Sequence, residues 1–163
     1  MQKKHKYFFY SLLFIISACS IAPDFSDIPE IEYVGMSKRT MVQSSLLSDS
    51  LILIFKFKDG DGDIGTDPSE NSFDMILTDS RTGNIFDRFK APKVPTPGAS
   101  NGIEGTIELK LYTTCCIFDE MIPPCSSPPD FPTNEFDLSL ILYDRAGNES
   151  NVIRTELITL LCD

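Results

Sequence analysis

The sequence predicts an all-β protein, an antiparallel β-sandwich of about seven short strands. Three observations support this class. Apolar and polar residues alternate in short segments, as in 106–112, where Ile107, Leu109 and Leu111 alternate with charged residues. Turns rich in Gly, Pro and Asp separate these segments. No segment has apolar residues at helical spacing, so an all-β class is favoured.

The expected strands follow one another along the chain, with irregular stretches at 91–102 and 113–134. The segment 51–57 has leucine and phenylalanine on one face and two isoleucines on the other, which is typical of a largely buried strand. The predicted strands are 31–35, 51–57, 73–78, 85–89, 106–112, 136–142 and 152–161.

Residues 1–18 have the composition of an export signal. Three lysines precede an apolar run of about a dozen residues, which is too short to span a bilayer as a helix. The run ends in Ile-Ser-Ala-Cys at 16–19, which resembles the lipobox of bacterial lipoproteins. This resemblance implies cleavage before Cys19 and acylation of that cysteine. The alternative is an ordinary signal peptide with Cys19 as a stray cysteine.

Three segments are therefore expected: a lipoprotein signal peptide at 1–18, a tether at 19–30 that starts from the lipidated Cys19, and a folded domain at 31–163. The lipid would anchor the protein to a membrane. The expected location is the bacterial outer membrane or the cell surface.

Charge and composition exclude several function classes. Loss of residues 1–18 removes three lysines and no acids, so the net charge changes from −10 to −13. So acidic a chain argues against nucleic acid as a partner and fits divalent cations or simple solubility. The only histidine, His5, lies in the expected signal. The mature chain then has no imidazole for Ser-His-Asp or Cys-His catalysis, and paired carboxylates are the common catalytic option that remains.

Three acids at alternate positions, Asp59, Asp61 and Asp63, follow the strand at 51–57 directly. Calcium takes six to eight oxygen ligands, which alternating carboxylates can supply when intervening glycines let the backbone curl around the ion. Without a cation, three such charges would repel one another. We therefore predict a structural Ca²⁺ site with a Kd of about 10⁻⁴ to 10⁻³ M, as in extracellular modules. The alternative is a solvated acidic turn, because Asp-Gly pairs are common in turns.

The segment 59–70 can be aligned with the twelve-residue calcium loop of helix-loop-helix proteins. The three alternating acids then fall on positions one, three and five, Gly65 on seven, Asp67 on nine and Glu70 on twelve. Ile64 takes the sixth position, where that family has glycine, and the flanking segments read as strands. The alignment thus supports the first three acids more than Asp67 and Glu70.

A wider resemblance rests on the strand that leads into DGDGDIG, on LILYDRAGNESN at 140–151 and on an Ile/Thr-rich last strand. These features resemble the immunoglobulin-like domains of bacterial surface proteins, especially small lipoproteins of Bacteroidota. The Cys-Trp-Cys pattern of antibody domains is missing. The resemblance implies an immunoglobulin-like β-sandwich in which the loops 59–70 and 144–150 share one end with the tether. Asp144 or Asn148 would then complete the cation site, unless Asp144 only caps its turn.

Four cysteines follow Cys19, and in an exported protein the default is two disulfides. A bridge between the adjacent Cys115 and Cys116 is strained and rare, so each is expected to pair elsewhere. The implied topology brings Cys162 to Cys115 or Cys116, at the end opposite the acidic loop, and leaves Cys125 for the other. The alternative is a four-thiolate zinc site, which lacks the usual Cys-x-x-Cys spacing.

These observations favour a non-catalytic, calcium-stabilised β-sandwich lipoprotein with a binding, adhesion or accessory role in the cell envelope. Its protein or glycan partner is not specified by the sequence. The first alternative is a carboxylate-dependent hydrolase that acts on envelope or extracellular glycans. The second is a purely structural envelope component.

Overall fold

A computed structural model describes the chain at residues 24–94, 102–118 and 121–163. The expected signal peptide and Cys19 lie outside these residues. The described ranges contain ten strands and no helix, and so no helix that is long and apolar enough to cross a membrane. The predicted all-β class is confirmed.

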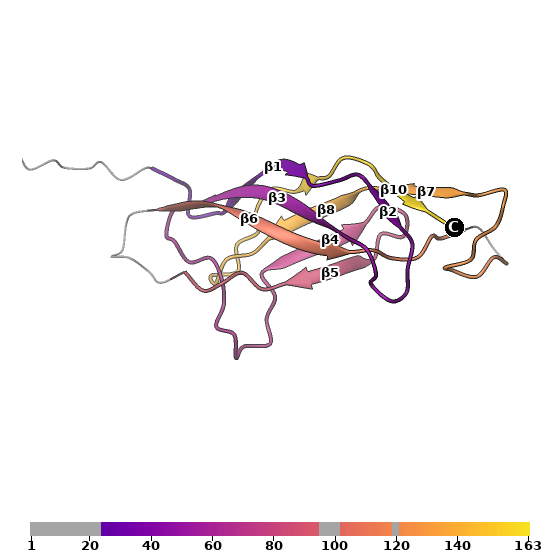
Figure 1. Cartoon of the computed structure of the whole chain (residues 1–163). Coiled ribbons are helices and arrows are strands. Elements are labelled where there is room, and N and C mark those ends of the chain that lie inside the picture. The colour runs from indigo at the N-terminus through magenta and orange to yellow at the C-terminus, as the bar shows by residue number, and fades with distance from the viewer. Residues whose placement is uncertain (1–23, 95–101, 119–120) are drawn as a thin grey trace, which may run out of the picture.

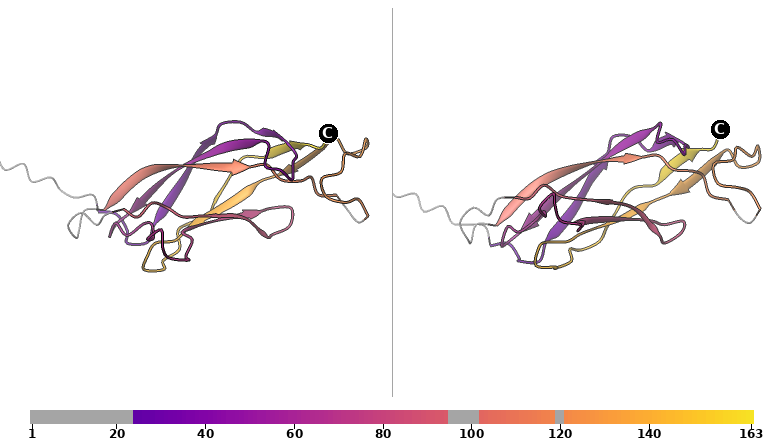
Figure 2. Two further views of the ribbon diagram at one scale, coloured as in Figure 1. Left: turned by 60° about the horizontal axis from the view of Figure 1, so that its bottom comes forward. Right: turned by 90° about the horizontal axis from the view of Figure 1, so that it is seen from below.

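The strands form three sheets, two of which face each other as layers (Figure 1, Figure 2). The first layer has the order β1-β3-β6, with β1 at Glu30–Met36, β3 at Ser50–Asp59 and β6 at Ile103–Tyr112. The second has the order β5-β4-β8-β9, with β5 at Ile85–Phe89, β4 at Met75–Asp79, β8 at Leu138–Leu142 and β9 at Ile153–Arg154. The third, near the C-terminus, has the order β2-β10-β7, with β2 at Thr40–Val42, β10 at Ile158–Leu161 and β7 at Thr133–Phe136.

Ten strands replace the expected seven because two predicted strands each divide into two that belong to different sheets, and because β2 is an additional strand. The predicted strand 136–142 divides at Asp137, whose backbone carbonyl accepts a hydrogen bond from the backbone N–H of Ser80 at 3.1 Å. The Ser80 hydroxyl in turn accepts one from the backbone N–H of Asp137 at 3.0 Å. These bonds replace ladder pairing at one residue, so the chain passes from β7 to β8. The predicted strand 152–161 divides in the same way into β9 and β10.

One strand pair departs from the expected antiparallel pattern. Strand β2 has only three residues, too few for a sequence signal, and it pairs with β10 in parallel register. The other strand pairs are antiparallel. The immunoglobulin-like assignment stays a prediction.

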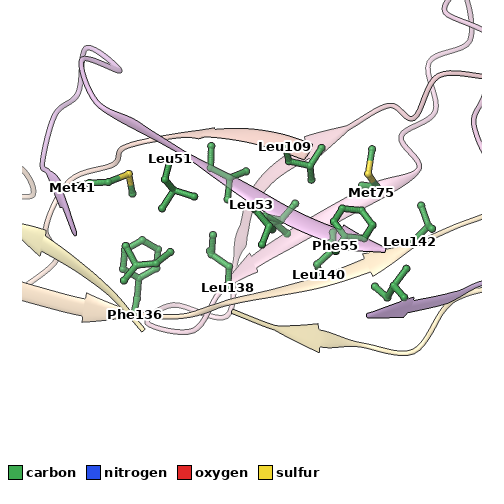
Figure 3. Close-up of a cluster of buried hydrophobic side chains, with 14 of the residues drawn as sticks. Met41, Leu51, Leu53, Phe55, Met75, Leu109, Phe136, Leu138, Leu140 and Leu142 are labelled. Atoms are coloured by element: carbon green, nitrogen blue, oxygen red, sulfur yellow. The ribbon is translucent and has the colours of Figure 1, made fainter. Parts of the chain in front are cut away.

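The core lies between the two layers, where alternate residues of β3, β4, β6 and β8 interdigitate (Figure 3). Strand β3 runs through its centre and buries the four residues that its sequence pattern predicts. Leu51, Leu53, Phe55 and Phe57 expose 1%, 0%, 0% and 9% of their surface. Each such side chain contributes about 1.5 to 3 kcal/mol by leaving water. Strand β3 is therefore held rigidly up to Asp59, its last residue.

The two ends of the sandwich differ in chemistry. We call the end with the loop at 59–66, the turn at 144–148 and the segment at 24–29 the acidic end. The disulfide end lies at the other extremity of β3 and β6 and holds the bridges Cys115–Cys125 and Cys116–Cys162. This pairing agrees with the expectation that Cys162 joins one of the adjacent cysteines and Cys125 the other.

Candidate metal centre

The three alternating acids converge just beyond the end of β3. Carboxylate oxygens of Asp59, Asp61 and Asp63 lie within 4.8 Å of one another. They differ in exposure, since Asp59 is completely buried, Asp63 is half-buried and Asp61 is exposed. The group is thus open to solvent at Asp61 and buried at Asp59, which suits a site that exchanges an ion with solvent.

The backbone of this loop is fixed by local bonds and by glycine. The backbone N–H of Asp63 donates to Oδ2 of Asp59 at 2.8 Å, which closes the turn. Gly62 and Gly65 have φ values of +71° and +84°, a left-handed conformation that glycine adopts at little cost. A Cβ at Gly65 would also lie 2.2 Å from the carbonyl oxygen of Pro92. Glycine at 65 is therefore required by the fold itself, whether or not its carbonyl binds an ion.

Ile64 explains why this loop departs from the helix-loop-helix pattern. Its side chain is 1% exposed and belongs to the core, and its backbone forms a β-bridge with Asp144. Ile64 anchors the loop to the domain through its buried side chain, so this position cannot hold the glycine that helix-loop-helix calcium loops have at their sixth position. The bridge confirms the predicted proximity of the loops 59–70 and 144–150.

The turn after β8 surrounds Asp63. The backbone N–H of Ala146 donates to Oδ2 of Asp63 at 3.0 Å, and the backbone N–H of Arg145 donates to its carbonyl oxygen at 3.3 Å. Asp144 is 5% exposed, and its two carboxylate oxygens accept bonds from Asn148, from the backbone N–H at 2.7 Å and from Nδ2 at 2.8 Å. Asp144 thus lies beside the three acids and caps its own turn.

Two carboxylate oxygens of this site have no protein partner. Oδ1 of Asp59 and Oδ1 of Asp63 are buried and accept no hydrogen bond among the residues that the structure describes. A buried acceptor without a donor usually costs about 1 to 3 kcal/mol, and more when it is charged. Both oxygens belong to the same small group of acids. A bound cation would supply the missing interaction for both at once.

The electrostatics of the site point the same way. Burial, followed by the charges of Asp61, Asp63 and Asp144, raises the pKa of Asp59 to about 6. Burial and then Asp144 and Asp61 also raise the pKa of Asp63, and Arg145 opposes this shift. Two unit charges 4 Å apart repel by about 4 kcal/mol at an effective dielectric constant of 20. The loop therefore holds its acids close together against a substantial repulsion.

The other predicted ligands are engaged elsewhere. Oδ1 of Asp67 accepts bonds from the backbone N–H of Ser69 at 3.0 Å and from its hydroxyl at 2.7 Å, and these bonds lower the pKa of Asp67. Glu70 is exposed, and its backbone N–H donates to the carbonyl of Asp67 at 3.0 Å. The structure does not bring either side chain into the group of three acids. The carbonyl oxygen of Gly65 accepts a bond from Nη1 of Arg145 at 2.9 Å.

Sequence reasoning missed two contributors to this end. Arg145 links the two loops, since its Nη1 also donates to the carbonyl of Ile64 at 3.2 Å. In the sequence, Arg145 could have been noticed as a single basic residue in a turn that also contains acids. The second contributor is the segment 24–29, which was expected to be a tether. The structure packs it on the loop, with Pro29 buried and Phe25 half-buried.

Comparison of the chain with protein-family models, with curated proteins and with solved structures finds no match.

Proposed function

We propose that this protein is a lipid-anchored, non-catalytic envelope protein whose β-sandwich is stabilised by a calcium ion held at Asp59, Asp61 and Asp63. The observation that carries the proposal is the pair of buried, unpartnered carboxylate oxygens of Asp59 and Asp63 within one group of acids. Calcium fits better than magnesium, because calcium accepts six to eight oxygens in a flexible arrangement, whereas magnesium demands near-ideal octahedral geometry. The carboxylate of Asp144 is the additional candidate, because its charge acts on both Asp59 and Asp63.

The same geometry favours a structural ion over a catalytic carboxylate pair. Glycoside hydrolases place their two carboxyl groups about 5 to 9.5 Å apart, with the sugar or water between them. The three acids of this chain offer oxygens within 4.8 Å of one another, which leaves room for an ion rather than a sugar ring. The role that we propose is binding, adhesion or support of an envelope complex at the outer membrane or cell surface, with Cys19 as the lipidated residue.

Calcium titration of the melting temperature tests this function. At 10 mM calcium, a Kd of 10⁻⁴ to 10⁻³ M corresponds to a gain of about 1.4 to 2.7 kcal/mol over the protein in EDTA. That gain raises the melting temperature by several degrees. Asp59→Asn should abolish the response to calcium, because it removes a buried charged ligand.

Asp67→Asn is the matched control, since its carboxylate caps Ser69 instead of joining the three acids. It should keep the response to calcium, and loss of the response would restore Asp67 to the ligand set. An identical melting curve in calcium and in EDTA for the wild-type protein would refute the calcium site.

A further inference from the structure

The segment Asp24–Pro29 lies along the acidic loop, immediately before β1. The backbone N–H of Gly60 donates to the carbonyl of Ser26 at 2.7 Å. Nδ2 of Asn148 donates to the carbonyl of Asp27 at 3.4 Å. The segment is thus held by one group from the loop after β3 and one from the turn after β8, the same two loops that form the acidic site.

Two glycines make room for this segment. A Cβ at Gly60 would lie 2.5 Å from the carbonyl oxygen of Phe25, and a Cβ at Gly102 would lie 2.7 Å from its ring. Nζ of Lys58 lies 5.6 Å from the centre of the same ring. The end of β3 and the start of β6 therefore form a seat for Phe25, and a side chain at residue 60 would close it.

The bond that holds the segment and the group that binds the ion share one stretch of backbone. Gly60 stands between Asp59 and Asp61, and Asn148 is bound to both oxygens of Asp144. In the same loop conformation, the N–H of Gly60 points to Ser26 and the carboxylates on either side of Gly60 lie close together. Oδ1 of Asp59, whose side chain is fully buried, has no partner in this conformation among the described residues.

We propose that the cation site controls the attachment of the domain to its N-terminal tether. When the ion is bound, the loop keeps its shape and the segment 24–29 stays in its seat. When the ion is lost, repulsion among the acids opens the loop, the N–H of Gly60 moves away from Ser26, and the domain pivots just before β1. This inference rests on the proposed function, because it needs the cation at Asp59, Asp61 and Asp63.

Hydrogen exchange of the full-length protein in detergent, with calcium and with EDTA, tests the inference. Calcium should slow exchange of the Gly60 amide on the order of tenfold, because this amide donates to Ser26 of the segment and that bond opens with the loop. The melting temperature, measured on the same samples, reports whether calcium binds at all.

The decisive variant is Gly60→Ala. Gly60 does not have a left-handed φ, and the three atoms nearest to a Cβ at this position, at 2.5 to 2.8 Å, are backbone atoms of Phe25 and Ser26. We expect the methyl group of alanine to displace the segment and to abolish protection of the amide at residue 60. Gly35→Ala is the control, because a Cβ at Gly35 of β1 would meet nothing within 4 Å. Phe25→Ala empties the seat without changing the acidic loop, so it should remove the same protection while calcium still raises the melting temperature.

The outcomes separate the inference from the function on which it rests. If calcium raises the melting temperature but leaves exchange of the Gly60 amide unchanged, the cation site stands and the control of the tether is refuted. If Gly60→Ala and Phe25→Ala keep full protection of the amide at residue 60, the proposed seat is refuted. If calcium changes neither quantity, the cation site fails and the inference fails with it.

Discussion

The disulfide end and the acidic end both bury acidic side chains, but only one of them neutralises those charges with the chain's own residues. At the disulfide end, Asp79 forms an ion pair with Arg81 at 2.6 Å, and both side chains are less than a tenth exposed. At the acidic end, Asp59 is fully buried, and its Oδ1 has no partner among the described residues. The buried Asp79 at the first end thus has its counter-charge, whereas the buried Asp59 at the second keeps an oxygen without a partner among the described residues.

Arg81 makes further contacts at the disulfide end. Its guanidinium also donates to Oδ1 of Asn134 at 2.7 Å and to the carbonyl of Cys115 at 3.3 Å, and it lies 4.1 Å from the centre of the Phe136 ring. Asp49 follows the same rule: it pairs with Lys38, and this bond, together with backbone N–H donors, lowers its pKa. The buried charge of Asp79 is stable at this end because Arg81 lies beside it as a counter-charge.

Replacement of Arg81 should have the largest effect. Arg81→Met leaves Asp79 buried without its counter-charge, so the free energy of unfolding should fall by about 3 to 5 kcal/mol in urea titrations. The matched control is Arg154→Met, because Arg154 forms a similar bond to Asp137 at 2.9 Å but is 69% exposed. Its loss should cost less than about 1 kcal/mol. Equal losses for the two variants would show that burial of the Asp79–Arg81 pair is irrelevant to its contribution.

Removal of the disulfides should come next and should separate the two bridges. Cys116–Cys162 closes a sequence separation of 46 residues, and Cys115–Cys125 one of 10. Loop entropy then predicts a loss of about 4 kcal/mol for the Cys116→Ala, Cys162→Ala variant and about 3 kcal/mol for the Cys115→Ala, Cys125→Ala variant. Urea unfolding of both variants measures the difference. The reverse order would show that the local bridge, which fixes the proline-rich stretch, contributes more than chain entropy predicts.

Replacement of Asp59 should have the smallest effect, and it should increase stability instead of lowering it. In EDTA at pH 7, Asp59→Asn should raise the free energy of unfolding by about 1 to 3 kcal/mol, because it removes a buried charge that repels its neighbours. The folded-state pKa of Asp59 is raised to about 6 from 3.8, so the wild-type metal-free protein loses stability as pH rises through this interval. The gain should therefore shrink below pH 6, where Asp59 is already neutral in the folded protein.

Thermal unfolding in EDTA at pH 5 and pH 7 measures this effect. A destabilised Asp59→Asn protein in EDTA would contradict the view that the acidic end is strained without its cation. Thr66→Ser, in the same loop, controls for small changes of the loop that leave its charges unchanged.

Local patterns in the sequence were enough for much of the fold. Alternation of apolar and polar residues located β6, because a strand with one buried face needs period two whatever it packs against, and a segment with apolar residues on both faces located β3. The sheet change at Asp137 was not predictable, because 136–142 alternates without interruption and the break arises from bonds to the distant Ser80. Strand β2 is too short for any periodic signal.

The candidate site divides in the same way. The spacing of Asp59, Asp61 and Asp63 predicted a group of acids, since the intervening glycines let the backbone curl and bring alternating carboxylates together. The exclusion of Asp67 was not predictable, because it depends on the local turn that Ser69 closes. Nor was the role of Arg145, whose contacts are made to residues about 80 positions away in the sequence.

By itself, the sequence determined the all-β class, the acidic loop and the set of cysteines available for pairing, because these depend on residue types and short spacings. Only the tertiary structure decided which acids are buried, which oxygens lack partners and that the segment 24–29 rests on the acidic loop. The physical reason is that burial and hydrogen-bond satisfaction are properties of the surroundings of an atom. Those surroundings come from strands far apart in the chain, so no local pattern contains them.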